Sequence, residues 1–340
     1  MVGKTPARER IETYVAPLVV GALALVTLIG LIAPAIKSPS PHDIPVGLAG
    51  PPEATQQIAG AFAANAPGAF VFTTFASEDD ARAALDSRAV DGVLVLGPGG
   101  PRLIIAGAAG DGVNGVITGA LTNVFKAQGQ NVAVETVHPF AAGDPHGLIL
   151  FFVVLAILVS TLIAQALAGL RRGTSFAGRV LVVILYAAIA APVSMALATW
   201  IAGGYGSGLW TAIALIGLGS VAVGVVVAGA AALLGRVGVA LTALIVVLLD
   251  LVSSGGPIGS QLLPDAYRWL APGMPAGQLY SAIRSALYFG NAGLADPVLV
   301  LSLWLLGGLL LLAIGTLVSR RSAAAKARLA ETLTPHVANG

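Results

Sequence analysis

Six apolar stretches constrain the fold of this chain more than any other feature of its sequence. A helix needs about 20 apolar residues to cross a hydrocarbon layer of about 30 Å. Helices that are apolar on every side cannot all be buried in one soluble core. The sequence therefore predicts a membrane all-α bundle of six transmembrane helices, at residues 14–36, 147–170, 180–202, 208–234, 237–254 and 297–318.

Two of these stretches need a further argument. Residues 237–254 reach spanning length only if Asp250 and the serines after it lie at the membrane interface. Residues 14–36 resemble a signal peptide, and Ala33-Pro34-Ala35 mimics a cleavage site. However, their apolar length exceeds the roughly 7–15 residues typical of a signal peptide. We predict an uncleaved first span, preceded by a surface helix within residues 1–13.

The composition excludes several classes of function. Hydrophobic residues make up 56% of the 340 residues and charged residues 10%, which fits one membrane domain and one modest soluble domain. A formal net charge of +2 gives no support to nucleic-acid binding. With no cysteine in the chain, disulfides, zinc–thiolate sites and cysteine nucleophiles are excluded.

Residues 37–146 differ from the rest, because charges, prolines and glycines interrupt every apolar run. Ser77 is a predicted helix N-cap, and the three acidic residues after it suit the positive end of a helix. Apolar periodicity predicts helices near 51–65, 77–85 and 113–125, and strands near 44–48, 70–75, 92–96, 103–106 and 132–137. This β-α-β-α-β-β-α-β order predicts an inserted α/β domain between the first and second spans.

Basic residues in short loops predict the orientation. With six spans, the basic residues of the N-terminus, of two loops and of the tail at 319–340 fall on one side: Lys4, Arg8, Arg10, Arg171, Arg172, Arg179, Arg236, Arg320, Arg321, Lys326 and Arg328. The loop at 203–207 on the other side has no charge, and aromatic residues flank it. We predict a multi-pass protein of the cell membrane with both termini cytoplasmic and residues 37–146 outside.

Polar residues within the apolar stretches are candidate functional residues, since burying them in a membrane is costly. Asp250 is a candidate for handling substrate or protons, or alternatively an interfacial residue that caps the following segment. Gln165 is expected to form a helix–helix hydrogen bond. A stripe of small residues at four-residue spacing predicts close helix packing, within the chain or in a dimer: Ser220, Gly224, Ala228 and Ala232.

Residues 255–296 are too polar to span and too apolar for an ordinary exposed loop. They predict a re-entrant or interfacial segment of short helices. Backbone at membrane depth must be buried in protein or face water. Tyr280, Arg284 and Tyr288 are the candidate residues lining such a cavity, and a loop packed on the bundle is the alternative.

The order of these segments resembles the ABC-2 type transporter permeases, most closely the branch of the YhgE/Pip (phage infection protein) proteins. Residues 77–98, 143–147 and 270–290 carry local similarity. The resemblance implies a permease subunit that exports a lipid-like, drug-like or other amphipathic substrate, as a homodimer or paired permease. It also implies a separate ATPase that faces residues 5–12 and 170–179, with Arg171, Arg172 and Arg179 as candidate docking residues. Alternatively, these arginines only set the orientation.

Known catalytic motifs are absent from the sequence. It contains no phosphate-loop motif, no His-Glu-x-x-His and no Gly-x-Ser-x-Gly, so we expect no enzyme activity and no cofactor in this chain. Three histidines and two aspartates lie near the ends of the insert, but their spacing matches no compact metal motif: His42, Asp43, His138, Asp144 and His146. The alternative function is an envelope receptor or assembly scaffold with an external binding domain.

Overall fold

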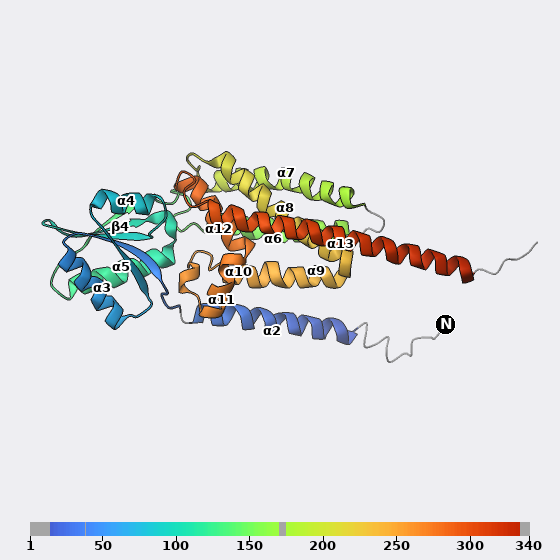
Figure 1. The fold of residues 1–340 in the computed structure, drawn as a ribbon, viewed down its shortest axis with the longest axis horizontal. Helices are drawn as coiled ribbons and strands as arrows, with labels where there is room; N and C mark the ends of the chain where they lie inside the picture. Colours follow the sequence, from blue (N-terminus) through green and yellow to red (C-terminus); the bar gives the residue numbers. More distant parts are fainter. Residues whose placement is uncertain (1–13, 38, 170–174, 334–340) are drawn as a thin grey trace, which may run out of the picture.

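The computed structural model describes residues 14–37, 39–169 and 175–333 (Figure 1). An α/β domain forms one end of an elongated molecule, and long helices extend from it (Figure 1). The predicted surface helix at 1–13 lies outside the described residues, as do Arg171 and Arg172.

The α/β domain is built on a five-stranded sheet with strand order β2-β1-β3-β4-β5. The strands β3 and β4 are antiparallel, and the other neighbours are parallel. The predicted order of strands and helices is confirmed: β1 (Ile44–Ala49), α3 (Pro52–Asn65), β2 (Phe70–Phe75), α4 (Glu78–Asp86), β3 (Gly92–Gly97), β4 (Gly100–Ala106), α5 (Asp111–Lys126) and β5 (Ala133–Val137).

The sheet buries both of its faces, because successive side chains of a strand point to opposite sides. Leu94 and Leu103 lie in one core, together with apolar residues of α3 and α5. Val93 and Ile104 lie in a second core with Leu85 of α4. Helices therefore cover both faces, and the strands β1 and β3 read as nearly continuous apolar runs.

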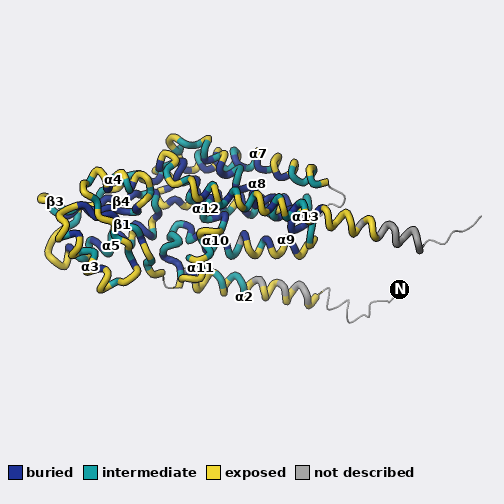
Figure 2. The backbone as a smooth tube through the Cα atoms, in the orientation of Figure 1, coloured by how far each residue is buried: buried dark blue, intermediate teal, exposed yellow. Residues whose placement is uncertain are grey.

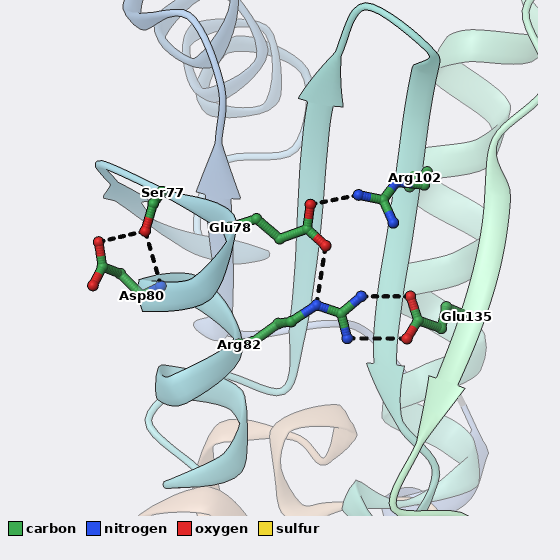
Figure 3. Close-up of polar contacts among 6 residues, drawn as sticks. All are labelled: Ser77, Glu78, Asp80, Arg82, Arg102 and Glu135. Carbon is green, nitrogen blue, oxygen red and sulfur yellow. Dashed lines mark hydrogen bonds and ion pairs between the residues drawn. The ribbon is translucent and has the colours of Figure 1, made fainter.

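Helix α4 begins where its sequence predicts. The Ser77 hydroxyl oxygen accepts a hydrogen bond from the Asp80 backbone N–H at 3.1 Å. Figure 3 shows this cap beside a network of charges across β4 and β5. There Arg82 donates to Glu78 and, through two bonds of 2.9 and 2.6 Å, to Glu135, while Arg102 donates to Glu78.

Among the described residues, five helices are long and apolar enough to cross a membrane. They are α6 (Leu148–Gly169), α7 (Phe176–Ala202), α8 (Leu209–Leu234), the interrupted helix Arg236–Ser253 and the stretch Ala295–Ser322 of α13 (Ala295–Leu333). The helix α8 is central, since it contacts α6, α7, α12 and α13. In α8, 67% of the apolar window is buried, against 39% or less in the other four.

Large apolar side chains are exposed along α7 and α13. Figure 2 accordingly colours many positions of both helices as exposed or intermediate. Large apolar patches on a protein surface mark contacts with another apolar phase or partner. Together with the length of the helices, these surfaces are those of a membrane-embedded protein.

Three predicted segments differ in detail from the structure. The first helix, α2 (Ala16–Lys37), has an apolar stretch of 15 residues, Gly21–Ala35, which falls short of the other five. The fifth is interrupted, as α9 (Arg236–Ala243), the π-helical turn η3 (Leu244–Leu249) and α10 (Asp250–Ser253). The last helix continues to Leu333 through most of the predicted tail, because its sequence holds neither proline nor glycine after Gly315 to end it.

Residues 255–296 form short helices at the end of the bundle that faces the α/β domain (Figure 1). The helix α11 (Asp265–Leu270) is followed by the longer α12 (Pro275–Tyr288). Pro275 stands at the first position of α12, where its missing N–H costs nothing. These helices lie between the domain and the long helices. They therefore form the bundle's side of the junction with the α/β domain.

Candidate functional site

A polar cavity of about 360 Å³ lies at the junction between the α/β domain and the segment α10–α12. Two of the predicted lining residues, Tyr280 and Arg284, border this cavity, whereas Tyr288 does not. Its other charged or titratable lining residues come from both sides of the junction: His42, Asp43, Arg88, Asp91 and Arg268.

Arg88 reaches the junction from the turn after α4. Its backbone φ of 62° is unusual for a residue with a side chain. The guanidinium Nη1 donates to the Ser281 carbonyl oxygen at 3.2 Å and to the Ser285 hydroxyl. The guanidinium carbon also lies 5.1 Å from the centre of the Phe289 ring. The side chain of this turn residue thus connects the domain to α12.

Arg284 makes the reciprocal contact from α12. Its Nη1 donates to the carbonyl oxygens of Ala108 and Ala109, at 3.2 and 2.5 Å. The guanidinium carbon lies 4.5 Å from the centre of the Tyr280 ring, which suits a cation–π contact. Its Nε is buried and has no hydrogen-bond partner among the described residues. Buried side-chain donors without a partner are uncommon in folded proteins.

Asp91 is the acidic residue of the cavity whose charge interacts with these two arginines. Its carboxylate accepts a hydrogen bond of 3.2 Å from Gln261. Burial raises the pKa of Asp91 to about 6, against the opposing effect of the charges on Arg88 and Arg284. Burial also lowers the pKa of Arg88 to about 10, and the repulsion from Arg284 adds to this shift.

Positive charge in the cavity is only partly neutralised. Arg268 is paired, since it lies 2.6 Å from Asp43 and 3.0 Å from Asp265. Within residues 14–37, 39–169 and 175–333, no carboxylate lies within 4.0 Å of the guanidinium of Arg88 or Arg284. The cavity therefore holds two cations that no carboxylate contacts, with the single acid Asp91 beside them, so its charge stays positive and favours an anionic ligand.

Unusual backbone conformations cluster at the same junction. In the described part of the chain, four residues other than glycine have a positive φ: Asp43, Arg88, His138 and Asn291. Asp43 pairs with Arg268, His138 packs against Phe289 at 4.9 Å between ring centres, and the Asn291 N–H donates to Ser285. Such conformations persist only where the surrounding contacts hold them, and they concentrate at functional sites.

Asp250 is fully buried, and it caps α12. Both of its carboxyl oxygens lie 2.9 Å from the backbone nitrogen of Ala276. A helix N-terminus has unpaired N–H groups and a partial positive charge, so a carboxyl group stabilises it. This contact is the cap that one of the two predicted roles of Asp250 describes, and its role in handling substrate or protons stays a prediction.

The tyrosines of α12 also tie the junction together. The Tyr280 hydroxyl donates to the Gly147 carbonyl at 3.1 Å, just before α6. The Tyr288 hydroxyl accepts from the Ala141 N–H at 3.3 Å. Both contacts link α12 to the segment that leads from the domain into α6.

Gln165 of α6 and Arg179 of α7 are two further predicted site residues that the structure describes. Gln165 is buried, and its Nε2 has no hydrogen-bond partner within the described residues. Its helix–helix hydrogen bond stays a prediction. Arg179 has Nε and Nη1 atoms that are buried without such a partner. Neither side chain lines the junction cavity.

The stripe of small residues on α8 packs within the chain. Ser220 lies 3.0 Å from the Thr161 hydroxyl of α6. A Cβ at Gly224 would lie 2.9 Å from Val183 of α7, and Ala228 shares a core with the same valine. The first of the two predicted uses of this stripe, packing inside the chain, is the one observed.

The histidines of the insert do not converge on a metal. His42 lies 3.9 Å from Asp265, His138 lies 2.7 Å from Asp86, and His146 contacts Asp111. Asp144 instead accepts from the Ile149 N–H at the start of α6. The described residues contain no group of three or more side chains that could hold a metal ion.

Sequence reasoning missed Arg88, Asp91 and Arg268 as site residues. The one local signal was Asp91, a charged residue directly before a buried apolar strand. Comparison of the chain with protein-family models and with curated proteins finds no match. The order of the elements and the junction cavity are therefore the observations that bear on function.

Proposed function

We propose that this chain is the membrane permease subunit of an exporter of the ABC-2 type, which moves an amphipathic substrate with energy from a separate ATPase. One observation carries the proposal: the order of elements. An apolar helix, an α/β domain and further apolar helices follow one another, and α12 stands before the last of them. This order is that of the permeases which the sequence resembles.

The proposed arrangement has six spans, α2 being the first, in the cell membrane. Both termini and the loop at 170–179 face the cytoplasm, and residues 37–146 lie outside. The charge bias of the short loops supports this orientation. The subunit is active as a homodimer or paired permease, and the ATPase partner hydrolyses ATP. Arg171, Arg172 and Arg179 contribute to docking that partner.

The position of α8 supports a path for motion between the two ends. Close packing joins α8 to α12, because a Cβ at Gly208 would lie 1.9 Å from the Ala286 carbonyl oxygen and one at Gly219 would lie 2.8 Å from Leu279. At its other end α8 packs on α7 and α13. Tightly packed helices have few alternative arrangements, so a shift of α8 must also displace α12.

Purification of the tagged full chain in a mild detergent tests the proposal. We expect an ATPase with a phosphate-loop motif to co-purify, and its ATP hydrolysis to rise when this chain is present. The variant Arg171→Ala/Arg172→Ala should lose the partner, whereas Arg102→Ala, on the opposite end of the molecule, should retain it. Recovery of the chain with no ATPase, in both detergent and native membranes, would refute the proposal.

One observation favours a second candidate function, an envelope receptor or scaffold. The α/β domain has an apolar cavity of about 600 Å³ between α3 and α5, lined by Phe62, Leu96 and Val124 among others. Pockets of this size and character bind small apolar ligands or side chains. A full chain that captures an external protein and associates with no ATPase would favour this candidate.

A further inference from the structure

Two cavities of different character meet at the junction. The polar cavity with Arg88 and Arg284 has a volume of about 360 Å³. A second cavity of about 220 Å³ is lined almost entirely by apolar residues, among them Ile32 and Ala35 of α2, Phe151 of α6 and Leu251 of α10. Since α2 packs beside α10 and η3, this second cavity lies among the apolar helices.

Gly256 lines both cavities. Its φ of 48° suits glycine, and a Cβ there would lie 2.8 Å from the Phe151 ring. Its N–H donates to the Ser254 hydroxyl at 3.2 Å. The absence of a side chain therefore leaves the polar and apolar spaces adjacent.

The polar cavity suits a phosphate group. Arginine binds phosphate through two parallel N–H donors, and Arg88 and Arg284 approach from opposite sides of the junction. Only Nη1 of each has hydrogen-bond partners within the described residues, so Nη2 of both arginines remains for a ligand, whereas Nε of Arg284 is fully buried. The volume is sufficient for a head group, because a water molecule occupies about 30 Å³.

We propose that the junction binds an anionic phospholipid, with its phosphate between Arg88 and Arg284 and an acyl chain in the apolar cavity beside α2. A ligand with one charged end and one apolar end matches both cavities at once. Free phosphate matches only the first, and a neutral amphiphile only the second.

This inference deepens the proposed function, since such a lipid is a substrate of the amphipathic class or a resident of the transport path. Its test needs no ATPase. If the chain binds the lipid but no ATPase, the proposed exporter function is refuted and the proposed lipid site is not. The opposite result would refute the site alone.

The experiment uses the full chain, delipidated in a maltoside detergent, and measures bound lipid by native mass spectrometry. The probes are dioleoylphosphatidylglycerol, dioleoylphosphatidylcholine and inorganic phosphate. We expect one phosphatidylglycerol per chain, bound at least about tenfold more tightly than the choline lipid, because its net charge is not cancelled within the head group. Equal affinity for the two lipids, or for inorganic phosphate, would overturn the proposal.

Substitutions test the two arginines. Arg88→Gln and Arg284→Gln should each weaken binding of phosphatidylglycerol by about tenfold or more, since each removes a charge-assisted contact. Arg102→Ala is the matched control, because Arg102 is paired with Glu78 and does not line the polar cavity. Wild-type affinity in both glutamine variants would overturn the proposal.

A second variant avoids the contacts that hold the domain on α12. Gln278 lines the cavity, and its side chain donates only to the Pro272 carbonyl among the described residues. Gln278→Glu places a negative charge in the cavity and should weaken phosphatidylglycerol binding several-fold relative to Gln278→Ala. Equal affinity in these two folded variants would contradict a phosphate at this position.

Discussion

Two groups of arginines in this molecule differ in whether carboxylates pair with them. In the network that links α4 to β4 and β5, Arg82 and Arg102 are matched by Glu78 and Glu135, with 2.6 Å between Arg82 and Glu135 (Figure 3). At the junction, Arg88 and Arg284 donate to carbonyl and hydroxyl oxygens, and in the described chain no carboxylate pairs with either. The first group is a structural network, whereas the second retains charge for a ligand.

The pKa shifts follow the same division. The hydrogen bond with Glu135 raises the pKa of Arg82, and that bond in turn lowers the pKa of Glu135. Burial lowers the pKa of Arg88 to about 10, and Arg284 adds repulsion. A cation whose charged form is disfavoured in the empty site gains most when an anion enters. Pairing with carboxylates, and not the number of arginines, therefore distinguishes the candidate site.

The largest expected effect concerns the cap that positions the junction. Asp250→Ala leaves the Ala276 N–H without its acceptor and removes the capping group of α12. A buried donor left unpaired, together with a lost cap, costs about 2–3 kcal/mol. We expect a clear fall in the denaturation midpoint in detergent and weaker phosphatidylglycerol binding.

Asp250→Asn separates the two parts of this effect. The amide oxygen still accepts from Ala276, so its loss of stability should be smaller than that of Asp250→Ala. Equal midpoints for Asp250→Ala and the wild type would show that α12 holds its position without the cap.

The next effect is a dependence of lipid affinity on pH. Burial raises the folded-state pKa of Asp91 to about 6, above its ordinary value of 3.8. A raised acid pKa contributes stability that is full below about pH 4 and is lost as the pH rises through about 6. Deprotonation also adds a negative charge beside Arg88 and Arg284, so phosphatidylglycerol affinity should fall several-fold between about pH 5 and about pH 7.

Asp91→Asn is the decisive variant, because His42 also lines the cavity. It should bind phosphatidylglycerol at neutral pH about as tightly as the wild type binds at low pH, and with a flatter pH profile. Glu135, in the network with Arg82, should show the opposite dependence on pH. Its pKa is lowered, so its contribution to stability is lost as the pH falls. An unchanged pH profile in Asp91→Asn would remove Asp91 from the site.

The α/β domain could be predicted from the sequence because its signals are local. Alternating apolar residues mark the strands, and Ser77 followed by acidic residues marks the start of α4. The five long apolar helices could be predicted for the same reason. The π-helical turn Leu244–Leu249 could not, because its residues are as apolar as those of a regular helix.

The junction depends on contacts that periodicity does not encode. Arg88 and Ser285 are 197 residues apart, and neither position looks unusual within its own helix or turn. The sequence did place Tyr280 and Arg284 beside a cavity, from the polar character of residues 255–296. It gave no reason to pair them with the turn after α4, because the partner of a side chain is a property of the tertiary fold.

The third expected effect is on the free energy of unfolding, and it depends on the backbone conformation at Arg88 and at Arg82. Arg88 has φ 62°, where a side chain costs about 1 kcal/mol more than glycine, whereas Arg82 lies inside the helix α4. Both Arg88→Ala and Arg88→Gly lose the side-chain contacts, but the glycine variant should be the more stable by about 1 kcal/mol. The order should reverse at position 82, where glycine weakens a helix by about 1 kcal/mol relative to alanine. Chemical denaturation of the four variants measures both differences, and the same order at both positions would contradict a strained turn at Arg88.

The smallest expected effect is at Arg102, and it completes the comparison. The Arg102 side chain is 44% exposed and is paired with Glu78, which also accepts from Arg82. Exposed ion pairs contribute about 0.2–1 kcal/mol, and salt screens them. Arg102→Ala should therefore lower stability by no more than about 1 kcal/mol, less at high salt, and leave phosphatidylglycerol affinity unchanged. A tenfold loss of affinity in this variant would mean that positive charge anywhere on the domain serves the lipid, and the distinction between paired and unpaired arginines would fail.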